Sequence, residues 1–185
     1  MTIAGLALLS GCTNQGADTS PRAAREPASS QAGALVGDDV KARIVDRAQF
    51  DELIADRRGQ VVLVDFWADW CEPCITNLPH VIEQASRLKE RGLAVVLVNV
   101  NAPEAAERTI AFLKSQQAGV ATNLISQYDG AAKSMTAFAI PSGLPCYRLY
   151  GRQGTLRHTF TVDPAAERQF TLQDLDAAVE QLLAE

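Results

Sequence analysis

The hydrophobic residues after Val40 follow runs and periods that predict alternating strands and helices. Two nearly continuous apolar runs, residues 61–67 and 94–100, are typical of strands that are buried on both faces of a sheet. A shorter run at residues 42–45 predicts one more strand. Elsewhere apolar residues recur at spacings of three and four, which predicts helices at residues 47–56, after Cys71 as far as Leu88, from about Pro103 to Leu113, and near 131–138.

The C-terminal part of the chain predicts a hairpin and a closing helix. Residues 144–150 and 156–162 flank Gly151-Arg152-Gln153-Gly154, a turn with a glycine at each end, so we expect them to pair as antiparallel strands. Thr171, followed by Asp174, resembles a capping box that opens a final helix. The order β-α-β-α-β-α-β-β-α predicts an α/β fold. Its central sheet should be mostly parallel, with helices on both faces and an antiparallel C-terminal hairpin.

Residues 12–39 lack any such period. They are rich in Ala, Ser, Gly, Gln and Pro, and only Leu35 and Val36 are sizeable apolar residues. A segment of this kind cannot bury enough surface to offset the entropic cost of ordering. The sequence therefore predicts a flexible tether at residues 12–39 and one folded domain at residues 40–185.

Charge and hydropathy narrow the range of partners. The chain has 22 Asp and Glu against 17 Lys and Arg, a net charge of -5, so it has no general attraction to phosphate backbones and we expect no nucleic-acid partner. No apolar run approaches the roughly 18 to 20 residues that cross a bilayer. Any membrane association would therefore be peripheral or would depend on an attached lipid.

Residues 1–11 resemble a short lipoprotein signal peptide. The small apolar residues from Ile3 run into Leu9-Ser10-Gly11-Cys12, which resembles a bacterial lipobox. In such signals the chain is cut before the cysteine, so the resemblance implies that Cys12 becomes a lipidated first residue, anchoring the protein outside the cytoplasm. Residues 1–11 contain no Lys or Arg, which departs from the usual signal. The alternative is an unprocessed N-terminus on a cytosolic protein.

The residues with distinctive chemistry lie where a predicted buried strand meets a helix. Asp65 is the one acid in the apolar run, and Cys71-Glu72-Pro73-Cys74 opens the next helix. The segment from Val64 to Cys74, followed by Pro79 and much later by Gly143-Leu144-Pro145, resembles a thioredoxin from about Val40 to the end. The resemblance implies a thioredoxin fold and disulfide exchange at Cys71 and Cys74.

The spacing of the two cysteines fits that chemistry. Cys71 would lie at the first turn of the helix, where unpaired N–H groups and the helix dipole favour the nucleophilic thiolate. Cys74 would lie one turn further in, close enough to form a disulfide with Cys71 and to displace a bound partner. Pro73 supplies a preset φ near the helix start. The alternative is an unreactive pair or half of a metal site.

The resemblance also assigns roles to residues around the pair. In thioredoxins an acid at the position of Asp65 lies beneath the second cysteine, which makes Asp65 the candidate general base for Cys74; a hydrogen-bonded structural Asp is the alternative. Thioredoxins commonly place a lysine near this acid, and residues 94–100 contain none. The family's cis proline corresponds to Pro145. The expected substrate-binding residues are Trp70, Glu72, Pro73, Leu144 and Pro145.

The Cys-Glu-Pro-Cys sequence is similar to that of membrane-tethered TlpA and ResA-like thioredoxins, which reduce disulfides outside the cytoplasm, including those of apocytochromes c awaiting haem. A carboxylate at Glu72 opposes thiolate formation at Cys71, which favours a reductant over an oxidant. The expected function is therefore periplasmic reduction of protein disulfides, with no bound cofactor and with electrons from a membrane donor. A disulfide-forming oxidase is the alternative.

Cys146 stands where thioredoxins more often have Thr. Its thiol could pair with Cys71, or Cys71, Cys74 and Cys146 together could hold a soft metal in a non-catalytic binding module. A small buried thiol that packs as a hydrophobic residue is the third interpretation. His80 and His158 are expected to be surface or partly packed residues rather than ligands.

Overall fold

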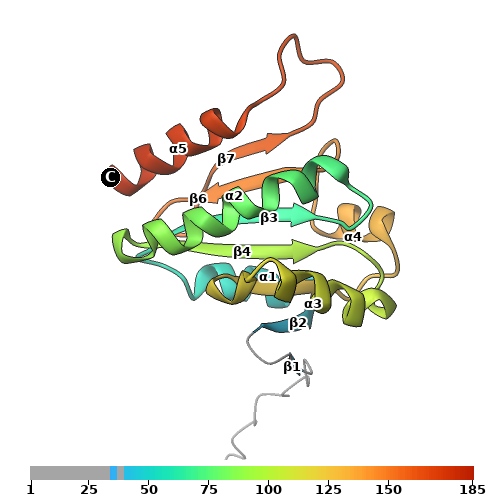
Figure 1. The fold of residues 1–185 in the computed structure, drawn as a ribbon. Coiled ribbons are helices and arrows are strands. Elements are labelled where there is room, and N and C mark those ends of the chain that lie inside the picture. Colours follow the sequence, from blue (N-terminus) through green and yellow to red (C-terminus); the bar gives the residue numbers. More distant parts are fainter. Residues whose placement is uncertain (1–33, 37–39) are drawn as a thin grey trace, which may run out of the picture. The chain divides into compact units, whose positions relative to one another are not determined.

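The computed structural model describes residues 34–36 and 40–185. The predicted signal peptide at residues 1–11, Cys12 and most of the predicted tether lie outside these described residues. The strands are β1 (Ala34–Val36), β2 (Lys41–Val45), β3 (Val61–Trp67), β4 (Leu93–Asn99), β5 (Thr122–Ser126), β6 (Cys146–Tyr150) and β7 (Leu156–Thr161). The α-helices are α1 (Arg47–Ala55), α2 (Glu72–Leu88), α3 (Ala106–Ser115), α4 (Ala131–Ala137) and α5 (Leu172–Ala184), shown in Figure 1. Three short 3₁₀ helices join them: η1 (Lys89–Arg91), η2 (Pro103–Ala105) and η3 (Ala118–Val120).

The seven-stranded sheet has the order β1-β2-β5-β4-β3-β6-β7. Four consecutive strands, β2, β5, β4 and β3, run parallel, whereas β1, β6 and β7 pair antiparallel with their neighbours. The predicted α/β fold, with a parallel centre and an antiparallel C-terminal hairpin, is therefore confirmed. β3 pairs with a strand on each side, and all seven of its residues are buried, because helices cover both faces of the sheet. This burial explains why its sequence is nearly all apolar.

Two strands were not predicted. β5 lies between α3 and α4, and its sequence Thr-Asn-Leu-Ile-Ser has polar residues at both ends, so it lacked the long apolar run by which the other inner strands were found. The structure also places β1 within the segment interpreted as a tether, paired with β2. The hairpin strand predicted from Leu144 begins instead at Cys146, directly after Pro145.

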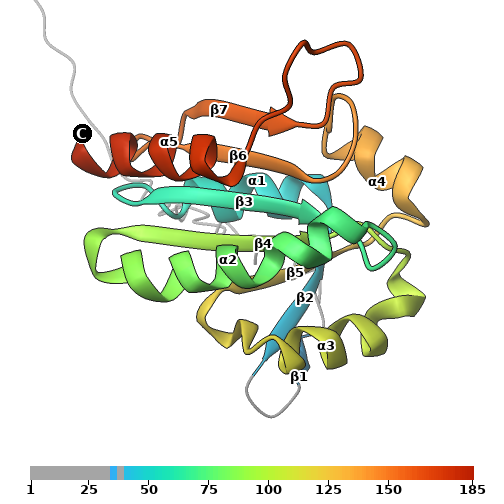
Figure 2. The same cartoon turned by 45° about the horizontal axis from the view of Figure 1, so that its top comes forward.

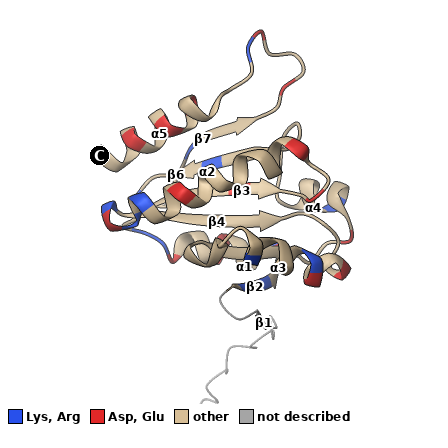
Figure 3. Ribbon diagram, in the orientation of Figure 1, with Lys and Arg blue, Asp and Glu red and all other residues tan. Residues whose placement is uncertain are grey.

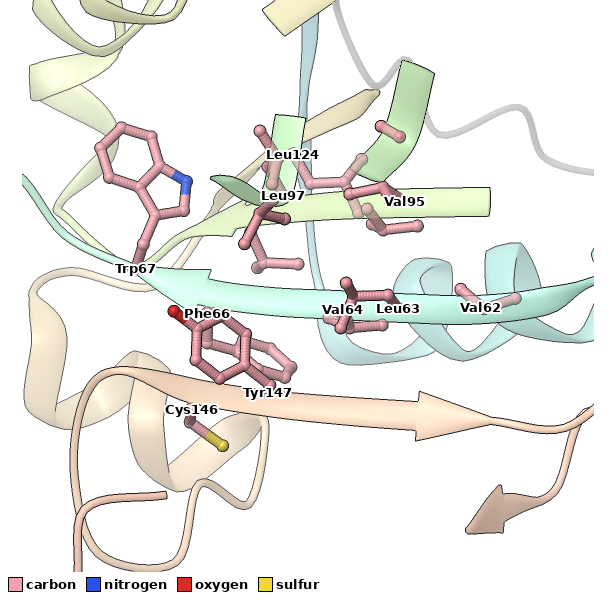
Figure 4. Packing of buried hydrophobic residues seen from close by; sticks show 14 of the residues in the cluster. Val62, Leu63, Val64, Phe66, Trp67, Val95, Leu97, Leu124, Cys146 and Tyr147 are labelled. Carbon is pink, nitrogen blue, oxygen red and sulfur yellow. The ribbon is translucent and has the colours of Figure 1, made fainter. Parts of the chain in front are cut away.

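Aromatic contacts show which helices cover each face of the sheet. Phe66 of β3 lies with its ring centroid 5.7 Å from that of Phe50 in α1 and 5.8 Å from that of Phe138, at the end of α4. Trp67 points to the opposite side of β3 (Figure 4), where its centroid lies 5.5 Å from that of Phe112 in α3. Helices α1 and α4 therefore cover one face, and α3 covers the other.

Helix α2 lies across β3 and β4 in both views of the fold (Figures 1 and 2). β4 carries no charged residue, and Asp65 is the one charged residue of β3 (Figure 3).

The predicted capping box at the start of α5 is present, with Thr171 and Asp174 exchanging hydrogen bonds. The helix predicted after Cys71 runs from Glu72 to Leu88 and contains Pro79.

Candidate active site

Cys71 is the N-cap residue of α2. Its backbone is extended, and its carbonyl accepts the first helical hydrogen bond from the Ile75 N–H at 3.1 Å. The Cys71 Sγ accepts a hydrogen bond from the Cys74 N–H at 3.3 Å, which satisfies one of the unpaired donors of the first turn. A sulfur held at this position is the one whose anionic form the helix N-terminus stabilises.

The structure contains the disulfide expected from the spacing. The Cys71 and Cys74 sulfurs are bonded at 2.09 Å, and their Cα atoms are 5.2 Å apart. Cys71 is 5% exposed and Cys74 is fully buried. Cys71 is thus the more exposed residue of the pair, which agrees with attack by Cys71 and resolution by Cys74.

Asp65 lies on β3 with its carboxylate fully buried. Neither of its oxygens has a hydrogen-bond partner among the described residues. Burial raises the pKa of Asp65 to about 8, because the charged form loses its hydration without gaining a partner. Its register partner on β4 is Leu97, and β4 carries no charged residue, so this neighbouring strand supplies no counter-charge.

The side chain of Asp65 faces α2. Its partner on β6 is Tyr147, and directly opposed residues of an antiparallel pair have side chains on the same face. The Tyr147 hydroxyl accepts a hydrogen bond from the Asn77 amide of α2 at 3.3 Å. Burial and the charge of Asp65 both raise the pKa of Tyr147. Asp65 and the second cysteine, which belongs to α2, therefore share one side of the sheet.

Tyr147 and Asn77 were missed by the sequence analysis. The available signal was polarity inside a strand that is otherwise buried, since Tyr147 and Arg148 both interrupt β6. Arg148 points to the other face, where its guanidinium carbon lies 5.1 Å from the Phe66 ring centroid. Only Tyr147 therefore belongs to the surroundings of Asp65.

The predicted substrate-binding residues differ in their exposure. Trp70 is 59% exposed beside the buried Cys71, whereas Trp67 is buried, as expected. Glu72 and Pro73 are exposed on the first turn of α2. The peptide between Leu144 and Pro145 is cis, as the resemblance implied.

Two hollows lie on either side of these residues. One, of about 260 Å³, is lined by Pro73 and Asn77 of α2, by Pro145, and by residues 169–172 before and at the start of α5. The other, of about 380 Å³, is lined by Trp70 and by residues of η2 and α3. The segment that precedes Cys71 and the first turn of α2 therefore each border a depression.

Cys146 is a buried free thiol on the opposite side of the sheet from α2. Its register partner on β3 is Phe66 (Figure 4), which packs against α1, whereas Cys74 belongs to α2. Burial raises the pKa of Cys146 to about 11, and its side chain is hydrogen-bonded to that of Thr161. Of the three interpretations of Cys146, the structure agrees with the small buried thiol that packs as a hydrophobic residue. Strand alternation directs its side chain to the face opposite α2, which does not fit a pairing with Cys71 or a metal site with Cys71 and Cys74.

The two histidines are partly packed, as expected. His80 Nε2 lies 2.8 Å from Asp176 Oδ1 of α5, and the ring of His158 stacks on that of Phe160. Within the part of the chain that the structure describes, no three His, Cys, Asp or Glu side chains are grouped as metal ligands. Nor, among the same residues, is any helix both long and apolar enough to cross a bilayer.

Comparison with known proteins assigns the family. Residues 36–167, which cover most of the chain, match the AhpC/TSA family. The chain belongs to the AhpC/TSA family. It is also 44% identical over 81 residues to thioredoxin 1 of Chlorobaculum tepidum. That match covers 43% of the chain and 72% of the relative. The predicted membership of the thioredoxin-like proteins is thereby confirmed.

A second relative and one solved structure extend the likeness. The thiol-disulfide oxidoreductase ResA of Bacillus subtilis (strain 168) is 36% identical over 62 residues, so the chain matches about a third of the length of this relative (34% of each). The crystal structure of a candidate thiol:disulfide interchange protein DsbE from Chlorobium tepidum gives a TM-score of 0.55 at 25% identity. That match covers 82% of this chain and 91% of the other.

Proposed function

We propose that this AhpC/TSA chain is a thiol-disulfide oxidoreductase that reduces disulfides of protein substrates. The observation that carries the proposal is the Cys71–Cys74 disulfide at the N-terminus of α2, on the side of the sheet where Asp65 is buried without a partner among the described residues. Burial of the Asp65 carboxyl without a hydrogen-bond partner destabilises the folded state. Proton exchange with Cys74 is a function that would account for an acid at this position.

The first step is attack on the substrate. In the reduced protein the Cys71 thiolate attacks one sulfur of the substrate disulfide, so the substrate S–S bond breaks and a mixed disulfide forms on Cys71. The other substrate sulfur leaves as a thiolate and takes a proton from solvent. The N–H of Cys74 and the dipole of α2 stabilise the attacking thiolate before this step.

The second step releases the substrate. The Cys74 thiol gives its proton to the Asp65 carboxylate, and the Cys74 thiolate attacks the Cys71 sulfur. The mixed disulfide breaks, the second substrate sulfur leaves and is protonated, and the Cys71–Cys74 disulfide forms. Two electrons have then passed from the dithiol to the substrate, so each further turnover needs a dithiol donor. We assign that role to a membrane electron donor.

The direction of transfer is supported by Glu72. Its exposed carboxylate follows Cys71 directly, and a negative charge there opposes the thiolate and so disfavours the dithiol form. A disulfide couple whose dithiol form is less stable has a lower reduction potential, so it donates electrons more readily than the couple of an oxidase. The resemblance to ResA-like proteins supports apocytochrome c disulfides as one substrate class; general repair of protein disulfides fits the same residues.

Reduction of insulin tests the proposal. Reduced protein, freed of excess reductant and mixed with insulin, is expected to lose two thiols for each insulin disulfide that is opened. Both lost thiols should be those of Cys71 and Cys74 when they are identified by mass tagging. Thiols that stay reduced, or stoichiometric zinc bound by the two cysteines, would contradict it and favour a binding module.

We further propose that a lipid on Cys12 holds the protein outside the cytoplasm. The support is the Leu9-Ser10-Gly11-Cys12 sequence, and stable anchoring by acyl chains follows from about 0.8 kcal/mol per buried CH₂. Expressed in a bacterial host, the protein is expected to partition into the detergent phase of Triton X-114. The Cys12→Ser variant should remain in the aqueous phase; equal partitioning of the two proteins would refute the anchor.

A further inference from the structure

A small hollow lies at the end of the sheet that is remote from the reactive disulfide. Its volume is about 110 Å³, and four polar side chains line it, those of Arg57, Gln60, Lys89 and Thr122; the other lining residues are apolar. β4 and β5 begin at this end, whereas Cys71 follows the end of β3, which runs parallel to β4. The disulfide-exchange reaction therefore makes no use of this hollow.

Arg57 brings a positive charge into the hollow without an anionic partner. Its side chain is partly buried, and the hydrogen bond that it makes within the described residues is from Nη2 to the Thr122 hydroxyl at 2.6 Å. A hydroxyl is neutral, so this bond does not balance the charge. The pKa of Arg57 lies below its ordinary value, because burial and the charge of Arg43 disfavour the cation more than Asp56 favours it. Charges removed from water are normally paired, so the site lacks a counter-ion.

The hollow offers hydrogen-bond donors that a bound anion can reach. Arg57 Nη1 has no hydrogen bond within the described residues and is not among the enclosed atoms, in contrast to Nε of the same side chain. Lys89 is exposed and forms no ion pair with any described residue. The Gln60 amide and the Thr122 hydroxyl are further donors. No acidic side chain in the described part of the chain lines the hollow.

The two cations lie just beyond the ends of two helices. Arg57 follows α1 after one residue, and Lys89 follows α2 directly. Each helix C-terminus is equivalent to about half a negative charge, which offsets only part of two full positive charges. The segment after α1 and the end of α2 lie at the same end of the sheet (Figure 3). In a chain of net charge -5, this pair of cations without carboxylate partners marks a local preference for anions.

The size of the hollow and its donors select a single small oxyanion. At about 30 Å³ for each water molecule, the hollow has room for three or four waters, which suits one phosphate group and excludes a whole nucleotide. A phosphate group also has enough oxygens to accept from all four side chains. Its bonds to Arg and Lys are charge-assisted, which makes them stronger than bonds between neutral groups.

We propose that this hollow binds a phosphate group between Arg57 and Lys89, with Gln60 and Thr122 donating to its remaining oxygens. The group is that of free inorganic phosphate or the terminal phosphate of a lipid headgroup. Because the hollow and Cys71 lie at opposite ends of the sheet, the site is independent of the proposed disulfide exchange.

Isothermal titration calorimetry of the oxidised full chain with inorganic phosphate tests the site. Chloride holds the ionic strength constant, so general screening does not change during the titration. The wild-type chain should bind one phosphate, and Arg57→Gln should weaken this binding about tenfold or more. Lys89→Gln, at an exposed position, covers the case in which Arg57→Gln fails to fold and should weaken binding to a similar extent. Arg58→Gln removes the same charge from an exposed residue outside the hollow, so this matched control should bind as the wild type does.

Co-sedimentation with phosphatidylcholine vesicles that contain phosphatidic acid identifies the source of the phosphate. All proteins carry Cys12→Ser, so that no attached lipid contributes. Vesicle binding that Arg57→Gln and Lys89→Gln lose and Arg58→Gln keeps would assign the lipid headgroup. Binding of inorganic phosphate without vesicle binding would assign the free anion. Lack of binding by the wild-type chain in both experiments, or equal weakening in Arg57→Gln and Arg58→Gln, would overturn the site.

Discussion

Replacement of Cys71 by serine is expected to abolish reduction of insulin disulfides, with a loss of rate on the order of a thousandfold or more. Serine keeps the N-cap hydrogen bond from the Cys74 N–H, but its hydroxyl does not ionise at neutral pH and cannot take the place of the thiolate. The rate of thiol loss after mixing with insulin measures the effect. Because the cap is conserved, the thermal stability of the reduced variant should change little.

Cys74→Ser and Cys146→Ser separate the roles of the other two thiols in the domain. Cys74→Ser should attack insulin at a nearly normal rate and then stop, accumulating a mixed disulfide on Cys71 that intact-mass analysis detects. Cys146→Ser should retain normal rates, because Cys146 is buried on the other side of the sheet and is hydrogen-bonded to Thr161. A Cys146→Ser protein as inactive as Cys71→Ser would contradict these assignments.

The second large effect is expected at Asp65. Asp65→Asn removes the proton acceptor for Cys74 and should slow release of the mixed disulfide by about 10²- to 10³-fold, while the initial attack by Cys71 is unchanged. In the wild-type protein the release rate should rise with pH and level off above about pH 8, where the Asp65 carboxyl is ionised. Rapid-quench measurement of both phases distinguishes the two steps. Equal slowing of attack and release would show that Asp65 has only a structural role.

The raised pKa of Asp65 also makes the stability of the oxidised protein depend on pH. The folded-state pKa of about 8 lies above the value of about 3.9 in an unfolded chain, so between these values the folded state binds one proton more. Asp65 therefore favours folding below about pH 4, and this contribution is lost as the pH rises towards 8. The slope is at most about 1.4 kcal/mol per pH unit for one proton. The free energy of unfolding, measured with urea at a series of pH values, should fall with pH more steeply for wild type than for Asp65→Asn, by up to this slope. The same pH dependence in both proteins would contradict the assignment.

Much of the fold could be predicted because its central elements have strong local patterns. β3 and β4 are long apolar runs, and α2 and α5 carry apolar residues at helical spacing, so burial alone identifies them. β5 escaped prediction because only Leu124 and Ile125 are sizeable apolar residues there. Its place in the sheet is decided by pairing with β2 and β4, which is a non-local property.

The residues of the site also differ in how far the sequence alone reveals them. Cys71, Cys74 and Asp65 could be found because thiols at a helix start and an acid in an apolar strand are local anomalies. Tyr147 was missed although its polarity in a buried strand was a signal, because its place beside Asp65 depends on strand register. The choice among the three interpretations of Cys146 also had to wait for the structure, because it depends on the face of the sheet to which the side chain points.

The most direct test of the central claim is the redox equilibrium of the Cys71–Cys74 pair. The protein, in a Cys12→Ser background, is equilibrated in graded thiol-disulfide buffers and its free thiols are counted by mass tagging, with Cys146→Ser alongside. We predict a reversible two-electron couple on Cys71 and Cys74 at or below about -220 mV, unaffected by Cys146→Ser. A couple above about -180 mV would contradict the reductant and indicate an oxidase, and the lack of any reversible couple would contradict the enzyme itself.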